Sequence, residues 1–200
     1  MSAVTLFEYE GHYAREVGAQ EVPRLQALFD ASPEYSLTVN GRKPHANEAQ
    51  LEFDEMPPPE FTFTRRWFLG LFEPSHELAG NAVIIEDLIA DKVWHIGLFL
   101  VATRLHGKGI AQGLYDALEA WMRSRGAEWL RLGVVSGNGR AERFWQRNAY
   151  VETRTRPFDT GGRMNTVRVM VKPLREPLTA ECLDAYLARV PRDRPEPVVP

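Results

Sequence analysis

The segment from Phe99 to Leu114 (FLVATRLHGKGIAQGL) holds the residues whose types and spacing best indicate chemistry. An apolar run typical of a strand passes through a turn containing Gly107 and Gly109 directly into a helical pattern. Such a junction presents unpaired N–H groups and the positive end of a helix dipole, which suit a phosphate. Lys108 adds a positive charge. We expect a phosphate-bearing ligand here, although a turn that merely closes a strand onto a helix has the same pattern.

Spacing excludes two common phosphate loops. A Walker loop requires Ser or Thr after Gly-Lys, whereas Gly109 follows Lys108. The dinucleotide fingerprint requires a small residue at the position of Gln112, and Gly113 comes one residue late. The five histidines show no paired spacing with carboxylates, so we predict no metal site.

The elements that must position this turn follow a regular order. From Arg66 onward, three segments rich in aromatic and β-branched residues (WFLGLF, ELAGNAVIIEDLI and KVWHIGLFLVA) predict successive antiparallel strands. An apolar face predicts a helix within residues 104–125. A strand (WLRLGVV), a short helix beginning near Asn138, and a hairpin from Tyr150 follow. The predicted order is β-β-β-α-β-α-β-β, an α/β (α+β) fold.

The flanking segments are less regular. Residues 13–17 predict a strand and residues 21–29 a helix, and residues 40–60 predict a turn, a short acidic helix and a proline stop on the surface. Residues 177–190 contain a last helix. Residues 191–200 (PRDRPEPVVP) are rich in proline and charge, and we expect a disordered tail.

Composition limits the class of protein. The chain has 200 residues, a net charge of −3 and a single cysteine, Cys182, so neither a disulfide within the chain nor a cysteine metal cluster is expected. The charge gives no large positive field for nucleic acid or anionic membrane. The start lacks the features of a signal peptide, and the longest apolar stretch, residues 96–102, is too short to span a bilayer. We therefore expect a cytoplasmic protein with small-molecule partners.

The glycine turn resembles the pyrophosphate motif of the GNAT superfamily of acyl-CoA-dependent N-acetyltransferases. That motif is written Arg/Gln-x-x-Gly-x-Gly/Ala, and the aligned residues are His106, Gly109 and Ala111, with Gly107 and Lys108 between them. Histidine departs from the motif because it is not a permanent cation.

A second GNAT motif, N-x-x-A-x-x-F-Y-x-x-x-G-F, follows in the family's order. Its positions are filled by Asn138, Ala141, Phe144, Trp145, Ala149 and Tyr150. Trp145 replaces the tyrosine that commonly acts as general acid, and an indole cannot serve as that acid. Tyr115 and Tyr150 are distant alternatives, and water is another. The resemblance covers about residues 67–171.

The resemblance implies a GNAT fold: a mixed, mostly antiparallel sheet, splayed between its fourth and fifth strands, with helices on both faces. Acetyl-CoA would lie in the splay along the open edge of the fourth strand, with the backbone of Leu100 and Val101 at the thioester oxygen. The implied cofactor contacts are Phe99, Leu100, Val101, His106, Gly107, Lys108, Gly109, Ile110, Ala111, Gln112, Asn138 and Trp145. Asn138 is equally explained as an ordinary helix cap. Arg140 or Arg143 is a further candidate for the 3′-phosphate of CoA.

An attacking amine must lose a proton, and His95 is the best candidate for the general base. It lies six residues before Val101, where some family members place a catalytic glutamate. A lone histidine in a strand is also often structural, and Glu86, Asp87 and His76 are reserves.

We therefore expect one acetyltransferase domain over residues 1–176, with an acceptor-site segment at about residues 20–60. It would transfer acetyl from acetyl-CoA to a primary amine of a small molecule, peptide or protein by direct attack in a ternary complex. A non-catalytic acyl-CoA-binding module is the alternative, and a homodimer is left open. Acidic residues of the acceptor segment would attract a cationic amine or only keep that surface soluble: Glu48, Glu52, Asp54 and Glu55.

Overall fold

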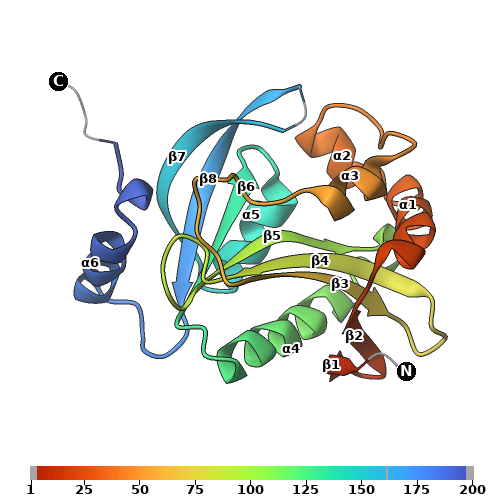
Figure 1. The fold of residues 1–200 in the computed structure, drawn as a ribbon, viewed down its shortest axis with the longest axis horizontal. Helices are drawn as coiled ribbons and strands as arrows, with labels where there is room; N and C mark the ends of the chain where they lie inside the picture. Colours follow the sequence, from red (N-terminus) through yellow and green to blue (C-terminus); the bar gives the residue numbers. More distant parts are fainter. Residues whose placement is uncertain (1–3, 161, 197–200) are drawn as a thin grey trace.

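The computed structural model describes residues 4–160 and 162–196, and it shows one twisted sheet with helices on both faces (Figure 1). The strands are β1 Thr5–Tyr9, β2 His12–Glu16, β3 Arg65–Phe72, β4 Leu78–Glu86, β5 Val93–Val101, β6 Trp129–Val135, β7 Val151–Asp159 and β8 Met164–Pro173. The helices are α1 Val22–Ala31, α2 Glu34–Val39, α3 Glu48–Asp54, α4 Ile110–Ser124, α5 Gly139–Arg147 and α6 Ala180–Arg189. Short 3-10 turns cover Ala19–Glu21, Thr103–Leu105 and Pro191–Asp193.

The sheet has the strand order β1-β2-β3-β4-β5-β6-β8-β7. Every neighbouring pair is antiparallel except β5 and β6, which are parallel because α4 connects them. The predicted order of strands and helices after residue 66 is confirmed. The predicted α/β fold, a mixed and mostly antiparallel sheet with helices on both faces, is confirmed as well.

Alternation along β3 defines the two faces of the sheet. The Trp67 ring meets Trp121 of α4 at a centroid distance of 5.2 Å. The Phe68 ring, one residue later, meets Phe53 of α3, also at 5.2 Å. We call these the α4 face and the α3 face. The largest apolar core lies on both sides of the sheet at this level.

The N-terminal region contains two elements that sequence analysis missed, the strand β1 and the six-residue helix α2. β1 packs on α4, where a Cβ added to Gly113 would lie 2.1 Å from the Tyr9 ring. Gly113 is therefore a glycine because β1 lies against α4. The strand predicted at residues 13–17 is β2, and the predicted helix at 21–29 is α1.

The strands β5 and β6 diverge. They are the pair that the resemblance calls the fourth and fifth strands, because β5 contains Phe99–Val101. They pair only from Val93–Trp129 to Ile96–Leu132, and both then continue without pairing to each other. The ladder between β4 and β5 shifts at this level, which leaves Gly97 without a partner in β4. A bulge of this kind bends a strand and increases its twist, so it turns the end of β5 away from β6.

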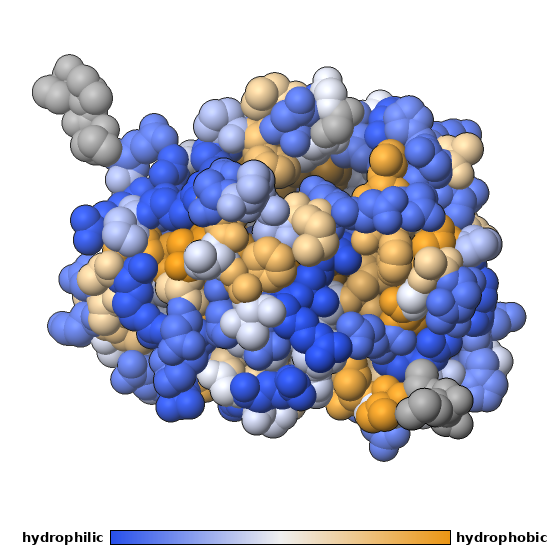
Figure 2. Space-filling view, viewed as in Figure 1, coloured by the Kyte–Doolittle hydropathy of each residue, from blue (hydrophilic) through white to orange (hydrophobic). Residues whose placement is uncertain are grey.

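Two hydrogen bonds join the end of α2 to the β7–β8 hairpin over the α3 face, and we call this contact the bridge. The Val39 carbonyl at the end of α2 accepts hydrogen bonds from Thr160 Oγ1 at 3.0 Å and Asn165 Nδ2 at 2.8 Å. The surface seen in Figure 2 is mostly hydrophilic with separate apolar patches. Exposed apolar side chains on α2, α3 and this hairpin are Leu37, Leu51, Phe158 and Met164. The hairpin turn was predicted through residues 160–162, of which residue 161 lies outside the described residues.

The C-terminal segment departs from the expected disordered tail. The helix α6 packs on β6 through Trp129 and Tyr186, whose ring centroids lie 4.6 Å apart. Pro191–Asp193 then form a 3-10 turn, and Asp193 is 1% exposed. The expectation of disorder is therefore wrong at the start of this segment, because a buried ion pair with Arg131 outweighs its polar composition. Residues 197–200 lie outside the described residues.

Candidate active site

A cleft of about 320 Å³ opens where β5 and β6 diverge. It is lined by the end of β5, the first turn of α4, one side of α5 and part of α2. Of the predicted contacts, the cleft lining includes Phe99, Leu100, Val101, His106, Ala111, Asn138 and Trp145. The structure thus brings together residues from two motifs that lie about 30 positions apart in sequence.

The glycine turn at the mouth of the cleft has open space in front of it. Gly107 and Gly109 have φ of +75° and +80°, a left-handed conformation that favours glycine. A Cβ on either residue would meet no atom within 4 Å. Gly109 caps α4, a helix of 15 residues, so the first N–H groups of that helix point out of its end. The Gln112 side chain turns away to Asp116 and Asn148, which leaves only its backbone for a ligand.

His106 holds an arginine beside this turn. Its Nε2 lies 2.9 Å from the Val101 carbonyl oxygen, and its Nδ1 contacts the guanidinium of Arg140. A carbonyl only accepts and a guanidinium only donates, so Nε2 carries the proton and Nδ1 accepts. The imidazole of His106 therefore holds the permanent charge of Arg140 beside the glycine turn. From the sequence, Arg140 is only one of two candidates for contact with the 3′-phosphate of CoA.

The backbone of β5 presents alternate N–H groups to the gap. The Ala102 N–H donates to the Ala79 carbonyl of β4, and Leu100 is paired with Asn81 of β4. Because N–H directions alternate along a strand, the amides of Phe99 and Val101 face away from β4 and toward the gap. Of the two backbone groups expected at a thioester, the Leu100 amide therefore faces β4, and the Val101 amide faces the gap.

Aromatic rings form the inner wall of the cleft. Trp145 is 7% exposed and packs against Phe99, Tyr115 and Tyr150 at centroid distances of 6.1, 5.4 and 5.2 Å. Tyr115 and Tyr150 are hydrogen-bonded to each other beneath it, and burial raises the pKa of both hydroxyls. Both phenols therefore stay protonated. Asn138 caps α5 by accepting from the Ala141 N–H at 3.2 Å, so its role as a helix cap is confirmed.

Comparison with known proteins identifies the family. A profile of the acetyltransferase (GNAT) family matches residues 25–150. The chain belongs to the GNAT family. A comparison with curated protein sequences gave no match.

Solved structures of GNAT proteins share the fold of this GNAT domain. An acetyltransferase from Thermus thermophilus has a TM-score of 0.63 at 20% identity, over 87% of this chain and all of its own. Spermidine N-acetyltransferase from Vibrio cholerae, solved with CoA and spermine, has 0.62 at 15% identity, over 82% of this chain and 96% of its own. The ribosomal-protein-S18-alanine N-acetyltransferase from Escherichia coli has 0.61 at 13% identity, over 84% and 97%. At such identities the likeness shows the fold alone.

The surroundings of His95 in this GNAT domain do not suit a general base near neutral pH. His95 lies on the α3 face, paired in register with Arg131 of β6. Arg131 Nη1 lies 3.3 Å from His95 Nδ1, and since arginine only donates, Nδ1 accepts and Nε2 carries the proton. Burial, followed by the charge of Arg131, lowers the pKa of His95 to about 3. At pH 6–7 His95 is a neutral hydrogen-bond donor through Nε2.

The three reserves for the base lie away from the cleft. Glu86 accepts from the Trp67 indole at 3.0 Å, at the opposite end of β4 from the gap. Asp87 accepts from Thr64 and from the Lys92 N–H, and so holds a turn. His76 Nδ1 is hydrogen-bonded to the Tyr13 hydroxyl oxygen at 2.7 Å.

One of the acidic residues expected either to attract a cationic amine or only to keep the surface soluble has the environment of a proton acceptor. Glu52 of α3 is half-buried. Burial, followed by the charge of Glu55, raises its pKa to about 7. Its charge acts on Tyr35, which lines the cleft, and Arg66 from β3 donates to the Glu52 carbonyl at 2.6 Å and holds the end of α3 on the sheet. A carboxylate with this pKa exchanges protons near neutral pH.

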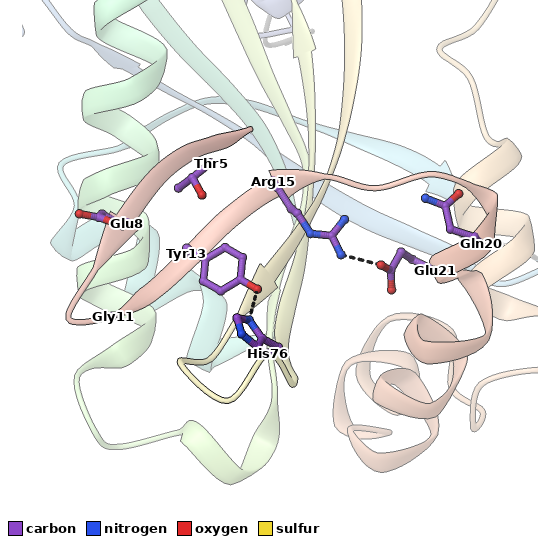
Figure 3. Close-up of a pocket in the computed structure, with 8 residues that line it drawn as sticks. All are labelled: Thr5, Glu8, Gly11, Tyr13, Arg15, Gln20, Glu21 and His76. Atoms are coloured by element: carbon purple, nitrogen blue, oxygen red, sulfur yellow. Dashed lines mark hydrogen bonds and ion pairs between the residues drawn. The ribbon is translucent and has the colours of Figure 1, made fainter. Parts of the chain in front are cut away.

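A second hollow, of about 690 Å³, lies between the β1–β2 ribbon and the loop before β4 (Figure 3). Two contacts within its lining are already made: Arg15 pairs with Glu21 at 2.5 Å, and the Tyr13 hydroxyl is hydrogen-bonded to His76. Within the described residues, no three His, Cys, Asp or Glu side chains gather in a way that could hold a metal ion. In the same part of the chain, no helix is long and apolar enough to cross a membrane.

Proposed function

We propose that the chain transfers an acetyl group from acetyl-CoA to a primary amine, with both substrates bound together. The observation that carries this proposal is the open glycine turn at the start of α4, beside Arg140 and at the mouth of the β5–β6 gap. It offers helix N–H groups and a permanent cation to a pyrophosphate, next to unpaired strand edges that suit a pantetheine arm.

Each part of acetyl-CoA has a place in this arrangement. The pyrophosphate lies against the N–H groups of Ile110, Ala111 and Gln112, with Lys108 and Arg140 beside it. The pantetheine follows the open edge of β5, where the Phe99 amide faces it. The Val101 amide faces the thioester oxygen, which gains negative charge when the amine attacks. The aromatic wall at Trp145 excludes water from this end.

The proton of the attacking ammonium needs an acceptor, and we assign it to Glu52. The charge of Glu52 acts on Tyr35, which lines the cleft, and the raised pKa of Glu52 keeps both of its protonation states populated near pH 7. Transfer through one ordered water is sufficient. The thiolate of CoA then takes a proton from water, because Trp145 has no acidic proton and the two tyrosines are buried beneath it.

The experiment begins with acetyl-CoA binding measured by calorimetry. Gly109→Asp puts a carboxylate beside the pyrophosphate, and we expect affinity to fall by about 100-fold or more, since close like charges cost several kcal/mol. Gly126→Asp is the matched control, because Gly126 also has positive φ and open space but lies at the far end of α4. Equal binding by wild type and Gly109→Asp would contradict the site.

Turnover separates the enzyme from a binding module. A panel of amines is supplied with acetyl-CoA, and release of free CoA is followed with a thiol reagent. Release that depends on an amine supports the transferase. Acetyl-CoA binding without release for any amine supports the non-catalytic alternative.

A further inference from the structure

One row of side chains crosses the α3 face of the sheet below the gap. Arg66, Ile85, His95 and Arg131 are register partners on β3, β4, β5 and β6, so they share one face. The ladder continues to β8 and β7, and it pairs Val135 with Val167 and Val167 with Arg156. Arg156 is thus on the same face, at the level where β5 and β6 have separated.

Two positions of the sheet between these groups carry no side chain. Gly97 of β5 and Gly133 of β6 are both exposed, and each lies two residues beyond a member of the His95–Arg131 pair. A molecule that enters the gap therefore finds bare backbone on the α3 face, with Arg156 at one side and the His95–Arg131 pair below. The bridge from Val39 to the hairpin limits the space above, which favours a small acceptor.

Three arginines lie near Gly97 and Gly133 on this face, and they differ in whether a carboxylate pairs with them. Arg131 is bound to Asp193 by two hydrogen bonds of 2.7 and 2.8 Å. Arg154 is paired with Glu196 at 2.6 Å. Among residues 4–160 and 162–196, no carboxylate lies within ion-pair distance of Arg156, and its buried Nε has no hydrogen-bond partner. Burial, followed by the charges of Arg131 and Arg192, also lowers the pKa of Arg156.

An arginine in this condition suits an anionic ligand. The Arg156 guanidinium lies 4.9 Å from the centroid of the Phe158 ring, which satisfies none of its N–H donors, whereas a carboxylate satisfies a guanidinium with two parallel hydrogen bonds. The neutral His95 adds an Nε2–H donor on the same face. A second ammonium at this position would instead face Arg156 directly, which disfavours polyamines as acceptors.

Resting on the acetyl transfer proposed above, we propose that the acceptor is a small amine that also carries a carboxylate, as an amino acid does. Arg156, assisted by His95, binds that carboxylate over Gly97 and Gly133. The amino group then lies toward the gap and the Val101 amide.

The test compares acceptors that differ only in the carboxylate. L-amino acids, the carboxamides of the same amino acids, and spermidine are supplied with acetyl-CoA, and kcat/KM is measured from CoA release. We expect the amino acids to exceed their carboxamides by about 10- to 100-fold, the usual worth of a hydrogen bond to a charged group. Carboxamides or spermidine that match the amino acids would overturn the proposal.

Variants of Arg156 test whether this residue causes the preference for a carboxylate. Arg156→Ala should remove the preference by lowering kcat/KM for the amino acids far more than for their carboxamides, and Arg156→Lys should restore part of the preference. Arg154→Ala is the matched control on the same strand and face, and it should keep the preference. Acetyl-CoA affinity, measured on each variant, should stay at the wild-type value and shows that the variant is folded.

The outcomes distinguish this subsite from the activity on which it rests. A preference that persists in Arg156→Ala refutes the subsite while the transferase stands. A wild-type protein that binds acetyl-CoA but releases no CoA with any of these amines refutes the transferase, and the subsite with it.

Discussion

Replacing Asp193 with asparagine tests how the C-terminal turn contributes to the fold. Asp193 is 1% exposed, accepts from Arg131 at 2.7 and 2.8 Å, and accepts from the Tyr186 hydroxyl at 2.6 Å. Asparagine keeps the shape but removes the charge, so Arg131 becomes a buried cation without a counter-ion. Losing one partner of a buried pair costs about 3–5 kcal/mol. In a domain of this size that lowers Tm by about 10 °C.

The assay is thermal and urea unfolding followed by circular dichroism. Asp184→Asn on the exposed side of α6 is the matched control, and it should leave the free energy of unfolding almost unchanged. The double variant Arg131→Met, Asp193→Leu should cost much less than the sum of its single changes, because no charge is left unpaired. A loss below about 1 kcal/mol for Asp193→Asn would refute the reasoning, since that is the usual limit for an exposed pair.

The contribution of Asp193 to the free energy of unfolding depends on pH in a definite direction. Burial alone raises the pKa of Asp193, but the hydrogen bonds and charge of Arg131 outweigh it, and the folded pKa lies below the usual 3.8. A depressed pKa contributes stability above the unfolded value, and that stability is lost as pH falls through the folded value. The difference between wild type and Asp193→Asn should therefore be full at neutral pH and shrink below about pH 4.

Three further predictions concern the cleft. Arg140→Ala should weaken acetyl-CoA binding by about 10-fold or more, the worth of a charged hydrogen bond, while Arg147→Ala on the exposed side of α5 should not change it; calorimetry decides. Glu52→Gln should abolish an acidic limb of kcat/KM near pH 7, whereas His95→Ala should leave that limb in place; a limb that follows His95 instead would return the base to β5. Trp145→Phe should keep most of the acetyl-CoA affinity, but Trp145→Ala should lower it and destabilise the fold by about 3–5 kcal/mol, and equal behaviour of the two would contradict a packing role.

Local sequence patterns are sufficient to predict most strands of the sheet. The strand β6 coincides with the run WLRLGVV, and α4 follows its apolar face, because alternation and helical periodicity are recorded within a few residues. The strand β1 and the six-residue helix α2 were missed because each is short and mostly exposed, so neither has a clear period. Asp193 was misjudged because its partner, Arg131, lies 62 residues away in sequence.

The candidate site also has parts that the sequence predicts and parts that it does not. The glycine turn is readable because positive φ and a helix start are local properties. The support of Arg140 by His106 spans 34 residues, and the environment of Glu52 depends on α3 lying over the sheet, so neither was visible in the sequence. The one signal that pointed to Arg140 was its place two residues after Asn138 in the second motif.

Two glycines four residues apart, Gly109 at the N-cap of α4 and Gly113 inside that helix, constrain the chain in different ways. At Gly109 the difficulty for any other residue is the backbone, which has φ of +80°, while the space around a side chain is empty. At Gly113 the backbone is ordinary helix and the difficulty is the Tyr9 ring, which already occupies the position of a methyl group. A library of variants at Gly109 would therefore be sorted by torsional preference, with asparagine favoured over β-branched residues. A library at Gly113 would be sorted by volume, and a smaller residue at position 9 would rescue alanine there.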